Sequence, residues 1–181
     1  MTQVRYINII VADRNLHGAD GDEKYADTMK EEFSPEAVSA LMEQASRLIH
    51  SLGFAEGLTP AQWSAMRYFS SAPPFNRTMA NLARFQGLTL GPVTRTVRTL
   101  MDKGYVERRP NPRSKKADLV ILTPTGKEHL KKDPRSQLAG VISKLSIEDR
   151  EAMITKLRVI VHGLLEIGLP QLDEELFNDL Y

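Results

Sequence analysis

The residues best suited to chemistry in this chain are positively charged, and they are concentrated in one stretch. Between Asn76 and Lys116 there are ten Lys or Arg residues and two acidic residues, a net charge of +8, whereas the whole chain carries +1. The other 14 basic and 21 acidic residues leave the rest of the chain at −7. Neutralising a phosphate backbone requires such a separation of charge. The alternative is a solvated charged surface, which is the usual interpretation of a short basic run.

The sequence contains no motif typical of redox, metal or catalytic chemistry. The chain has no cysteine, which excludes disulfides, thiolate metal sites and a cysteine redox switch. We find no phosphate-binding glycine loop, no nucleophile elbow and no HExxH motif. We therefore expect no cofactor, no metal and no enzymatic activity. Four histidines are too widely spaced to form a metal motif: His17, His50, His129 and His162.

Length and composition predict one soluble domain, or one compact domain with extensions. The 181 residues are 41% hydrophobic and 26% charged, as in ordinary globular proteins. No apolar run approaches the roughly 18 residues that span a bilayer. The run from Ile7 to Val11 is too short for a signal peptide. We expect a cytoplasmic protein that does not bind membranes.

The elements that must position the basic residues can be predicted from helix start signals. Ser34 before Pro35, and Thr59 before Pro60, pair an N-cap residue with proline at the first helical position. Thr78 and Thr89 are the N-caps predicted for a third and a fourth helix. Glycine or proline ends these four helices, near residues 53, 73, 87 and 104.

Two short strands, over residues 105–109 and 117–122, follow the fourth helix. The segment 110–116 contains two prolines, which cannot donate to a sheet, so we expect it to leave the sheet and project as a hairpin tip. Thr123 and Pro124 start another helix, broken or kinked near Pro134. Ser146 and Asp149 resemble a capping box at the start of a long final helix.

Helix, turn, helix and hairpin in this order predict a winged helix-turn-helix that binds duplex DNA. One face of the fourth helix is apolar, and Arg95 and Arg98 fall on the opposite face, free to enter a major groove. The candidate DNA contacts of this helix are Thr89, Leu90, Gly91, Pro92, Thr94, Arg95 and Arg98. The candidates on the wing and its flanks are Arg77, Arg108, Arg109, Arg113, Ser114, Lys115 and Lys116.

The sequence resembles the MarR family of bacterial transcription regulators over roughly residues 35–168. The motifs that carry the resemblance lie at residues 58–63, 88–90, 93–95, 102–110 and 122–126. The resemblance implies a mainly α fold with a small β-hairpin wing, and a homodimer formed by the N- and C-terminal helices. It implies a winged lobe over residues 58–133, a dimerisation region over 34–57 and 134–181, and leaves residues 1–33 as an arm.

The resemblance also implies binding to a pseudo-palindromic operator, commonly relieved by a small aromatic or anionic effector. The region where the family forms its effector pocket corresponds to His50, Trp63 and Arg67, although Trp63 is better explained as a core residue. The wing departs from the family pattern of an Asp and, two residues on, an Arg, because Ser114 and Lys116 stand there. Arg113 could supply the missing guanidinium.

The leading hypothesis is a ligand-responsive repressor. One alternative is an effector-independent, architectural DNA-binding module. Another is a winged-helix module whose basic surface binds an acidic protein partner. The lack of interleaved acidic residues on the face that carries Arg95 argues against this last alternative.

Overall fold

The computed structural model describes residues 33–167, apart from the side chain of Lys115. The predicted arm, except for its last residue, and the end of the predicted dimerisation region from residue 168 lie outside the described residues. The chain separates into two compact units, with the boundary between Arg47 and Leu48.

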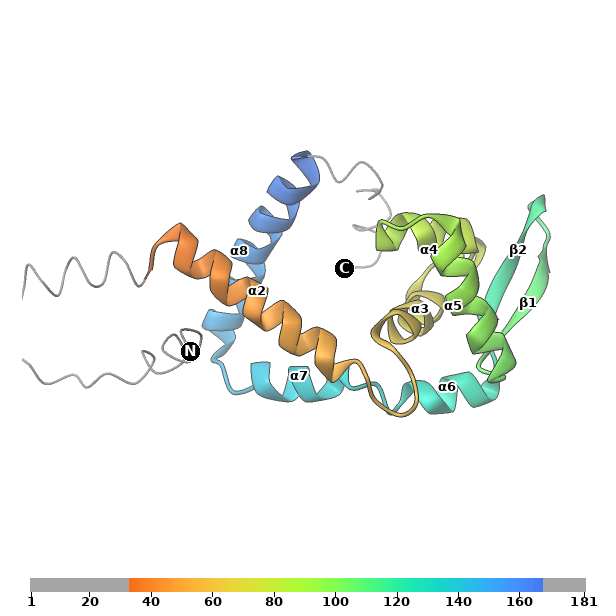
Figure 1. Cartoon of the computed structure of the whole chain (residues 1–181), viewed down its shortest axis with the longest axis horizontal. Coiled ribbons are helices and arrows are strands. Elements are labelled where there is room, and N and C mark those ends of the chain that lie inside the picture. The colour runs from red at the N-terminus through yellow and green to blue at the C-terminus, as the bar shows by residue number, and fades with distance from the viewer. Residues whose placement is uncertain (1–32, 168–181) are drawn as a thin grey trace, which may run out of the picture. The chain divides into compact units, whose positions relative to one another are not determined.

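The described elements are mostly helical, with one antiparallel hairpin (Figure 1). This confirms the predicted fold class. The elements in chain order are α2 (Pro35–Leu52), α3 (Pro60–Ser71), the 3₁₀-helix η2 (Pro74–Asn76), α4 (Met79–Gln86), α5 (Leu90–Asp102), β1 (Val106–Asn111), β2 (Ser114–Leu122), α6 (Pro124–Leu130), α7 (Arg135–Ile142) and α8 (Ile147–Glu166).

Hydroxyl side chains start the helices where the sequence predicts them. The Oγ1 atoms of Thr59, Thr78 and Thr123 accept the otherwise unpaired N–H group three residues later. Thr89 occupies the predicted N-cap of α5, but its side chain makes no capping hydrogen bond. At α8, Ser146 Oγ accepts from the Asp149 N–H and donates to the Asp149 carboxylate, both at 3.0 Å.

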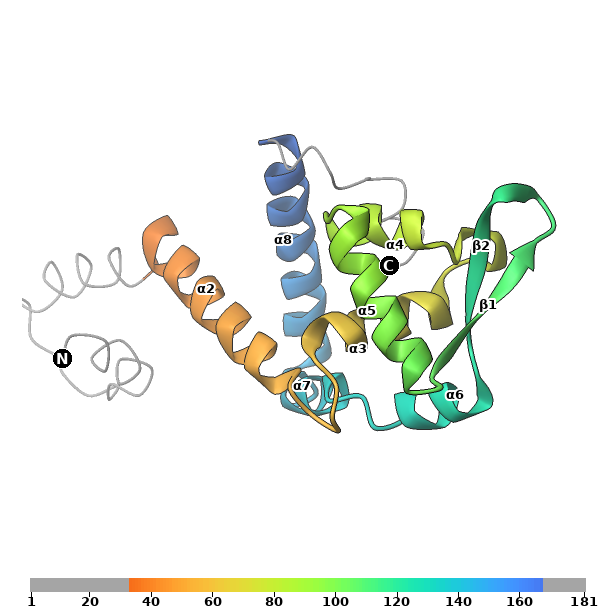
Figure 2. The ribbon, with the colours of Figure 1, turned by 45° about the vertical axis from the view of Figure 1, so that its right-hand side comes forward.

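The hydrophobic core of the second unit lies between α3, α4, α5 and the base of the hairpin (Figure 2). The predicted apolar face of α5 is confirmed, because Val93, Val97 and Leu100 have 0% exposed surface. Met101, the fourth residue of that face, is half-buried and packs against the core. The core consists of Leu58, Trp63, Ala65, Met66, Tyr68, Phe69, Ala72, Leu82, Ala83, Val93, Val97, Leu100, Val106, Val120 and Leu122.

Three stacked rings join α3 and α6 to the turn before β1. The His129 ring lies between Trp63, at 5.4 Å between centroids, and Tyr105, at 4.4 Å. Both pairs are nearly parallel, with interplanar angles of 8° and 15°. Among the described residues His129 Nε2 is buried and has no hydrogen-bond partner. The stack therefore depends on ring contact and not on a polar network.

Gly126 lets α6 approach the backbone that precedes β1. A Cβ atom at this position would overlap the carbonyl oxygen of Tyr105 and lie 2.8 Å from its carbonyl carbon. The same carbonyl oxygen accepts from the Thr123 N–H at 3.1 Å, and Thr123 Oγ1 donates to the Gly104 carbonyl at 2.6 Å. The first turn of α6 is thus held directly against the end of α5.

The hairpin is more extended than the sequence predicts. We expected residues 110–116 to leave the sheet, but β1 continues to Asn111 and β2 begins at Ser114. The register shifts between Arg109 and Asn111, so Pro110 lies at the irregularity, where a missing N–H donor costs least. Only Pro112 and Arg113 form the tip.

We expect Gly126→Ala to lower the free energy of unfolding by about 1–3 kcal/mol, because the new methyl group must displace the Tyr105 backbone. Urea unfolding followed by Trp63 fluorescence, at one protein concentration, measures the change. Gly140→Ala on α7 is the matched control. Nothing lies within 4 Å of a Cβ there, so helix propensity should raise stability by about 0.5–1 kcal/mol. Equal effects of the two substitutions would contradict the close approach at Gly126.

We expect His129→Phe to raise the free energy of unfolding by about 1 kcal/mol, because it keeps both ring contacts and removes a buried unpaired nitrogen. His129→Ala removes both ring contacts and should lower stability by about 1–3 kcal/mol. The same urea titration measures both variants. A loss of stability in His129→Phe as large as in His129→Ala would show that the imidazole nitrogen is needed.

Candidate nucleic-acid interface

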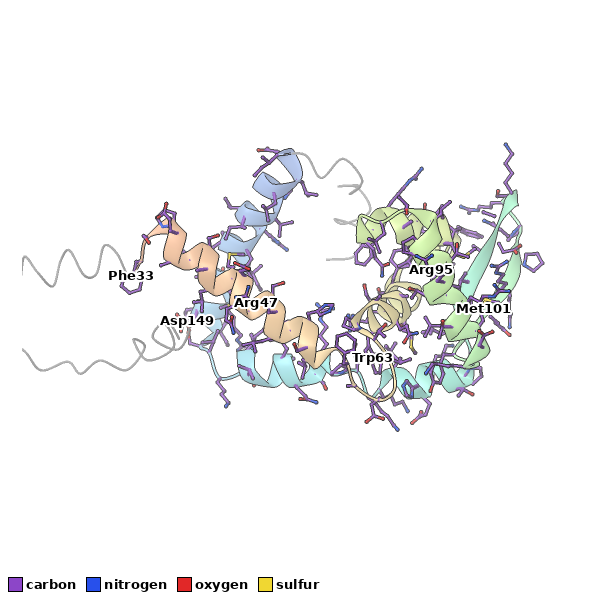
Figure 3. All side chains as sticks on the ribbon, in the orientation of Figure 1. Phe33, Arg47, Trp63, Arg95, Met101 and Asp149 are labelled. Atoms are coloured by element: carbon purple, nitrogen blue, oxygen red, sulfur yellow. The ribbon has the colours of Figure 1, made fainter. Side chains whose placement is uncertain are left out.

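The face of α5 opposite the core presents basic and hydroxyl side chains to solvent. Thr94, Arg95 and Arg98 are exposed, and Figure 3 shows Arg95 on this helix. Within the described residues, the guanidinium groups of Arg95 and Arg98 make no hydrogen bond or ion pair. All their donors are therefore available to a ligand that lies against this face.

The first turn of α5 is exposed and largely apolar. Leu90 exposes 53% of its surface, and no atom lies within 4 Å of a Cβ built on Gly91. Thr89 is exposed, and Pro92 is half-buried. The backbone here can approach another molecule closely, and Leu90 offers the kind of surface that packs on a thymine methyl group.

Two predicted wing contacts on β1 already have partners. Arg109 donates from Nε and Nη2 to the Glu107 carboxylate at 3.0 and 2.7 Å, so much of its charge is compensated locally. Arg108 Nη2 lies 4.0 Å from the sulfur of Met79 on α4. Both side chains are exposed, so they remain at the surface.

The tip of the wing is ordered by local contacts. The Arg113 N–H donates to Asn111 Oδ1 at 2.9 Å, and the Arg113 guanidinium carbon lies 3.6 Å from the centroid of the Phe75 ring. The Lys116 N–H donates to Ser114 Oγ at 3.2 Å, and the Lys116 side chain is exposed. Sequence reasoning missed Phe75, because an isolated phenylalanine beside two prolines carries no functional signal.

Arg77, another predicted contact, is engaged with the protein itself. Its Nε donates to the Ala72 carbonyl at 2.8 Å and its Nη2 to the Ser70 carbonyl at 3.4 Å. Its own carbonyl accepts from the Val120 N–H at 2.7 Å. Arg77 therefore ties the end of α3 to β2, a role that residue type alone could not reveal.

The three candidate effector residues have separate surroundings. Trp63 is fully buried in the core, and its Nε1 donates to the Ala55 carbonyl at 3.3 Å. Arg67 Nη1 donates to both carboxylate oxygens of Asp133 at 2.9 and 3.1 Å. His50 is exposed, with its ring edge-on to Phe54 at 5.4 Å. No hydrogen bond, ion pair or ring contact joins these three to one another within residues 33–167.

Residues 33–167 contain no group of three or more His, Asp or Glu side chains arranged to hold a metal ion. No helix within them is long and apolar enough to cross a membrane.

Sequence comparison supports the predicted relationship. Residues 56–117 match the family model described as MarR family. A stretch of 49 residues is 43% identical to the multiple antibiotic resistance protein MarR of Salmonella typhimurium, and equally to that of Salmonella typhi. This stretch is 27% of the present chain and spans about a third (34%) of each relative's length.

Solved structures share the fold. The S. aureus MepR–DNA complex has a TM-score of 0.60 at 19% identity, covering 70% of this chain and 97% of that chain. Streptococcus pneumoniae FabT in complex with DNA has a TM-score of 0.57 at 19% identity, with 74% and 96% covered. A MarR transcriptional regulator from Methanosarcina mazei Go1 has a TM-score of 0.58 at 21% identity, with 76% and 99% covered.

The order of the elements, the family match over residues 56–117 and the shared fold agree with one another. The resemblance inferred from the sequence agrees with this match, which covers residues 56–117.

Proposed function

We propose that this protein is a DNA-binding transcription regulator with no catalytic activity of its own, acting in the cytoplasm on the nucleoid. The observation that carries the proposal is an exposed, basic face on α5, a helix whose opposite face is fully buried. β1 packs against α5, so the wing and this helix belong to the same compact unit. The shared fold with two proteins solved in complex with DNA supports the proposal.

In the proposed complex, α5 lies in the major groove and the wing lies along the neighbouring backbone or minor groove. Arg95 is the candidate for reading a base, because a guanidinium with free donors can bond the two acceptors of guanine. Such a pair contributes about 1–3 kcal/mol of discrimination. Thr89, Leu90, Gly91, Pro92 and Thr94 supply the close surface around it.

We further propose that the protein acts as a homodimer on a pseudo-palindromic operator. On α8, Ile154, Leu157 and Leu164 recur at helical spacing and expose 52%, 42% and 50% of their surface. On α2, Leu41 and Leu48 each expose 61%. Large apolar side chains repeated along a helix mark a surface that another protein covers. A second copy of the chain would bury them.

Repression relieved by a small ligand is the finer form of this proposal. A ligand at the predicted position would meet Arg67, whose guanidinium forms an ion pair with Asp133. A ligand carboxylate matches this partner chemically, so an aromatic acid could replace Asp133. A rise in melting temperature with aromatic carboxylates, lost in Arg67→Ala, would favour this form. Its absence would favour the alternative of an effector-independent module.

We expect the affinity for duplex DNA to fall steeply with salt. A duplex selected from a random 30-base-pair pool provides the probe, and fluorescence anisotropy at several salt concentrations provides the dissociation constants. Each neutralised phosphate contributes about −0.9 to the slope of log affinity against log salt. We expect a slope of several units. A flat response would exclude this DNA-binding mode.

We expect Arg95→Ala and Lys116→Ala to weaken binding in different ways. Loss of a base contact should reduce the preference for the selected duplex over a scrambled one, by a factor equivalent to about 1–3 kcal/mol. Loss of a phosphate contact should weaken both duplexes alike and reduce the salt slope by about one unit. Competition anisotropy with the two duplexes measures both effects. If each variant weakened binding to the selected and the scrambled duplex by the same factor, the assignment of base reading to Arg95 would be wrong.

We expect Leu157→Asp to shift the protein from dimer to monomer, because it places a charge on the apolar face of α8. Analytical ultracentrifugation over a range of concentrations measures the dissociation. Lys156→Asp is the matched control, since it also adds an acidic side chain at an exposed neighbouring position but off the apolar face. Equal dissociation in both variants would argue against this face as the interface.

A further inference from the structure

One exposed aromatic side chain takes no part in the core. Phe75 lies in η2, between α3 and α4, and exposes 38% of its surface. The guanidinium of Arg113 at the wing tip lies over the face of this ring, 3.6 Å from its centroid. A cation over an aromatic face at this distance is attracted by the ring quadrupole. Residues 38 positions apart in the sequence are thus joined at the tip of the wing.

Hydrogen bonds fix the backbone that carries the Phe75 ring. Tyr68 Oη donates to the Asn76 carbonyl at 2.8 Å, and Asn81 Nδ2 donates to the same carbonyl at 3.2 Å. Burial raises the pKa of Tyr68, which keeps its hydroxyl protonated as a donor. Because Arg77 also accepts from the Val120 N–H, the segment around Phe75 is tied to both the core and β2.

Stacking leaves the hydrogen-bonding edge of Arg113 unused. A guanidinium carries its five N–H donors in the plane of the group, and contact with a ring occupies only one face. Within the described residues the Arg113 side chain has no hydrogen-bond partner, whereas Arg109 is bound to Glu107 and Arg77 to backbone carbonyls. Arg113 therefore combines a fixed position with free donors.

We infer that Phe75 is a positioning residue, and that it holds Arg113 as the wing side chain that donates to DNA. This inference rests on the proposed function. Lys116, the alternative, has a long exposed side chain that makes no hydrogen bond or ion pair with another described residue, so it acts as a flexible point charge. An arginine already held in place loses less conformational freedom on binding, which favours the bound state.

The stack can be tested in the protein alone. The Phe75 ring current should move the NMR signals of the Arg113 side-chain δ protons upfield in the unaltered protein. Phe75→Leu should return them to ordinary values, and Phe75→Tyr should keep the shift. Unshifted Arg113 signals in the unaltered protein would overturn the inference, whatever the binding data show.

The coupling to DNA is tested by a double-mutant cycle on the selected duplex. We expect Phe75→Leu to weaken binding about two- to fivefold, the range of an exposed cation–π contact. Arg113→Ala should weaken it more, and the double variant no further than Arg113→Ala alone. Phe75→Tyr should bind like the unaltered protein. Phe54→Leu, at a phenylalanine that exposes 62%, and Lys127→Ala, on α6, are controls for ring and charge loss.

Additive effects of Phe75→Leu and Arg113→Ala would overturn the inference while leaving the proposed function intact, as would an Arg113→Ala effect no larger than that of Lys127→Ala. Failure of the unaltered protein to bind any duplex, with the ring-current shift present, would overturn both. Duplexes with A·T or G·C flanks identify the acceptor. If Arg113→Ala weakens binding more on A·T flanks than on G·C flanks, the acceptor lies in the minor groove. If it weakens binding equally on both, the acceptor is phosphate. Either result supports donation to DNA.

Discussion

The burial of one face of α5 is the constraint on which the site depends. Val93, Val97 and Leu100 have no exposed surface, and rotating the helix about its axis would bring these side chains into water. Removing three branched side chains from water contributes several kcal/mol, at about 1.5–3 kcal/mol each. The period of 3.6 residues then leaves Arg95 and Arg98 only one direction, away from the core. The basic face is thus a consequence of core packing.

Two attachments to the same core hold the wing in position. At its base, the Tyr105 backbone is fixed by Gly126 and Thr123 of α6, and Val106 is buried against the helices. Further out, β2 is bonded to the Arg77 carbonyl. A two-stranded hairpin is marginally stable alone, so these attachments account for an ordered wing whose outer surface is solvated.

Because each signal acts over a few residues, local signals in the sequence were sufficient to predict most of the elements, although not η2. Threonine caps followed by proline, and glycines such as Gly87 in a left-handed conformation, satisfy the helix ends directly. The apolar face of α5 was predictable for the same reason. The extent of the hairpin was not, because whether Pro110 ends a strand or occupies a bulge depends on the partner strand.

Side-chain partners far apart in the chain lay beyond sequence reasoning. Lys103 Nζ donates to the Gly57 carbonyl across 46 positions, and Arg67 meets Asp133 across 66. Neither residue type nor spacing indicates such a pair, because the fold brings the partners together. For the same reason the stack of His129 between Trp63 and Tyr105 had no sequence signal.

Such partners also reduce the number of basic residues in residues 76–116 whose donors are available to a ligand. Its formal surplus of +8 counts every cation equally, but Arg109 is compensated by Glu107 and Lys103 is bonded to a carbonyl. Among the described residues of this stretch, cations with unengaged donors lie on α5 and the wing, at Arg95, Arg98, Arg113 and Lys116, and on α4, at Arg84. A ligand that follows α5 and the wing meets a positive potential set by a few placed guanidinium groups. The fold thus converts a diffuse excess of basic residues into a surface with a defined geometry.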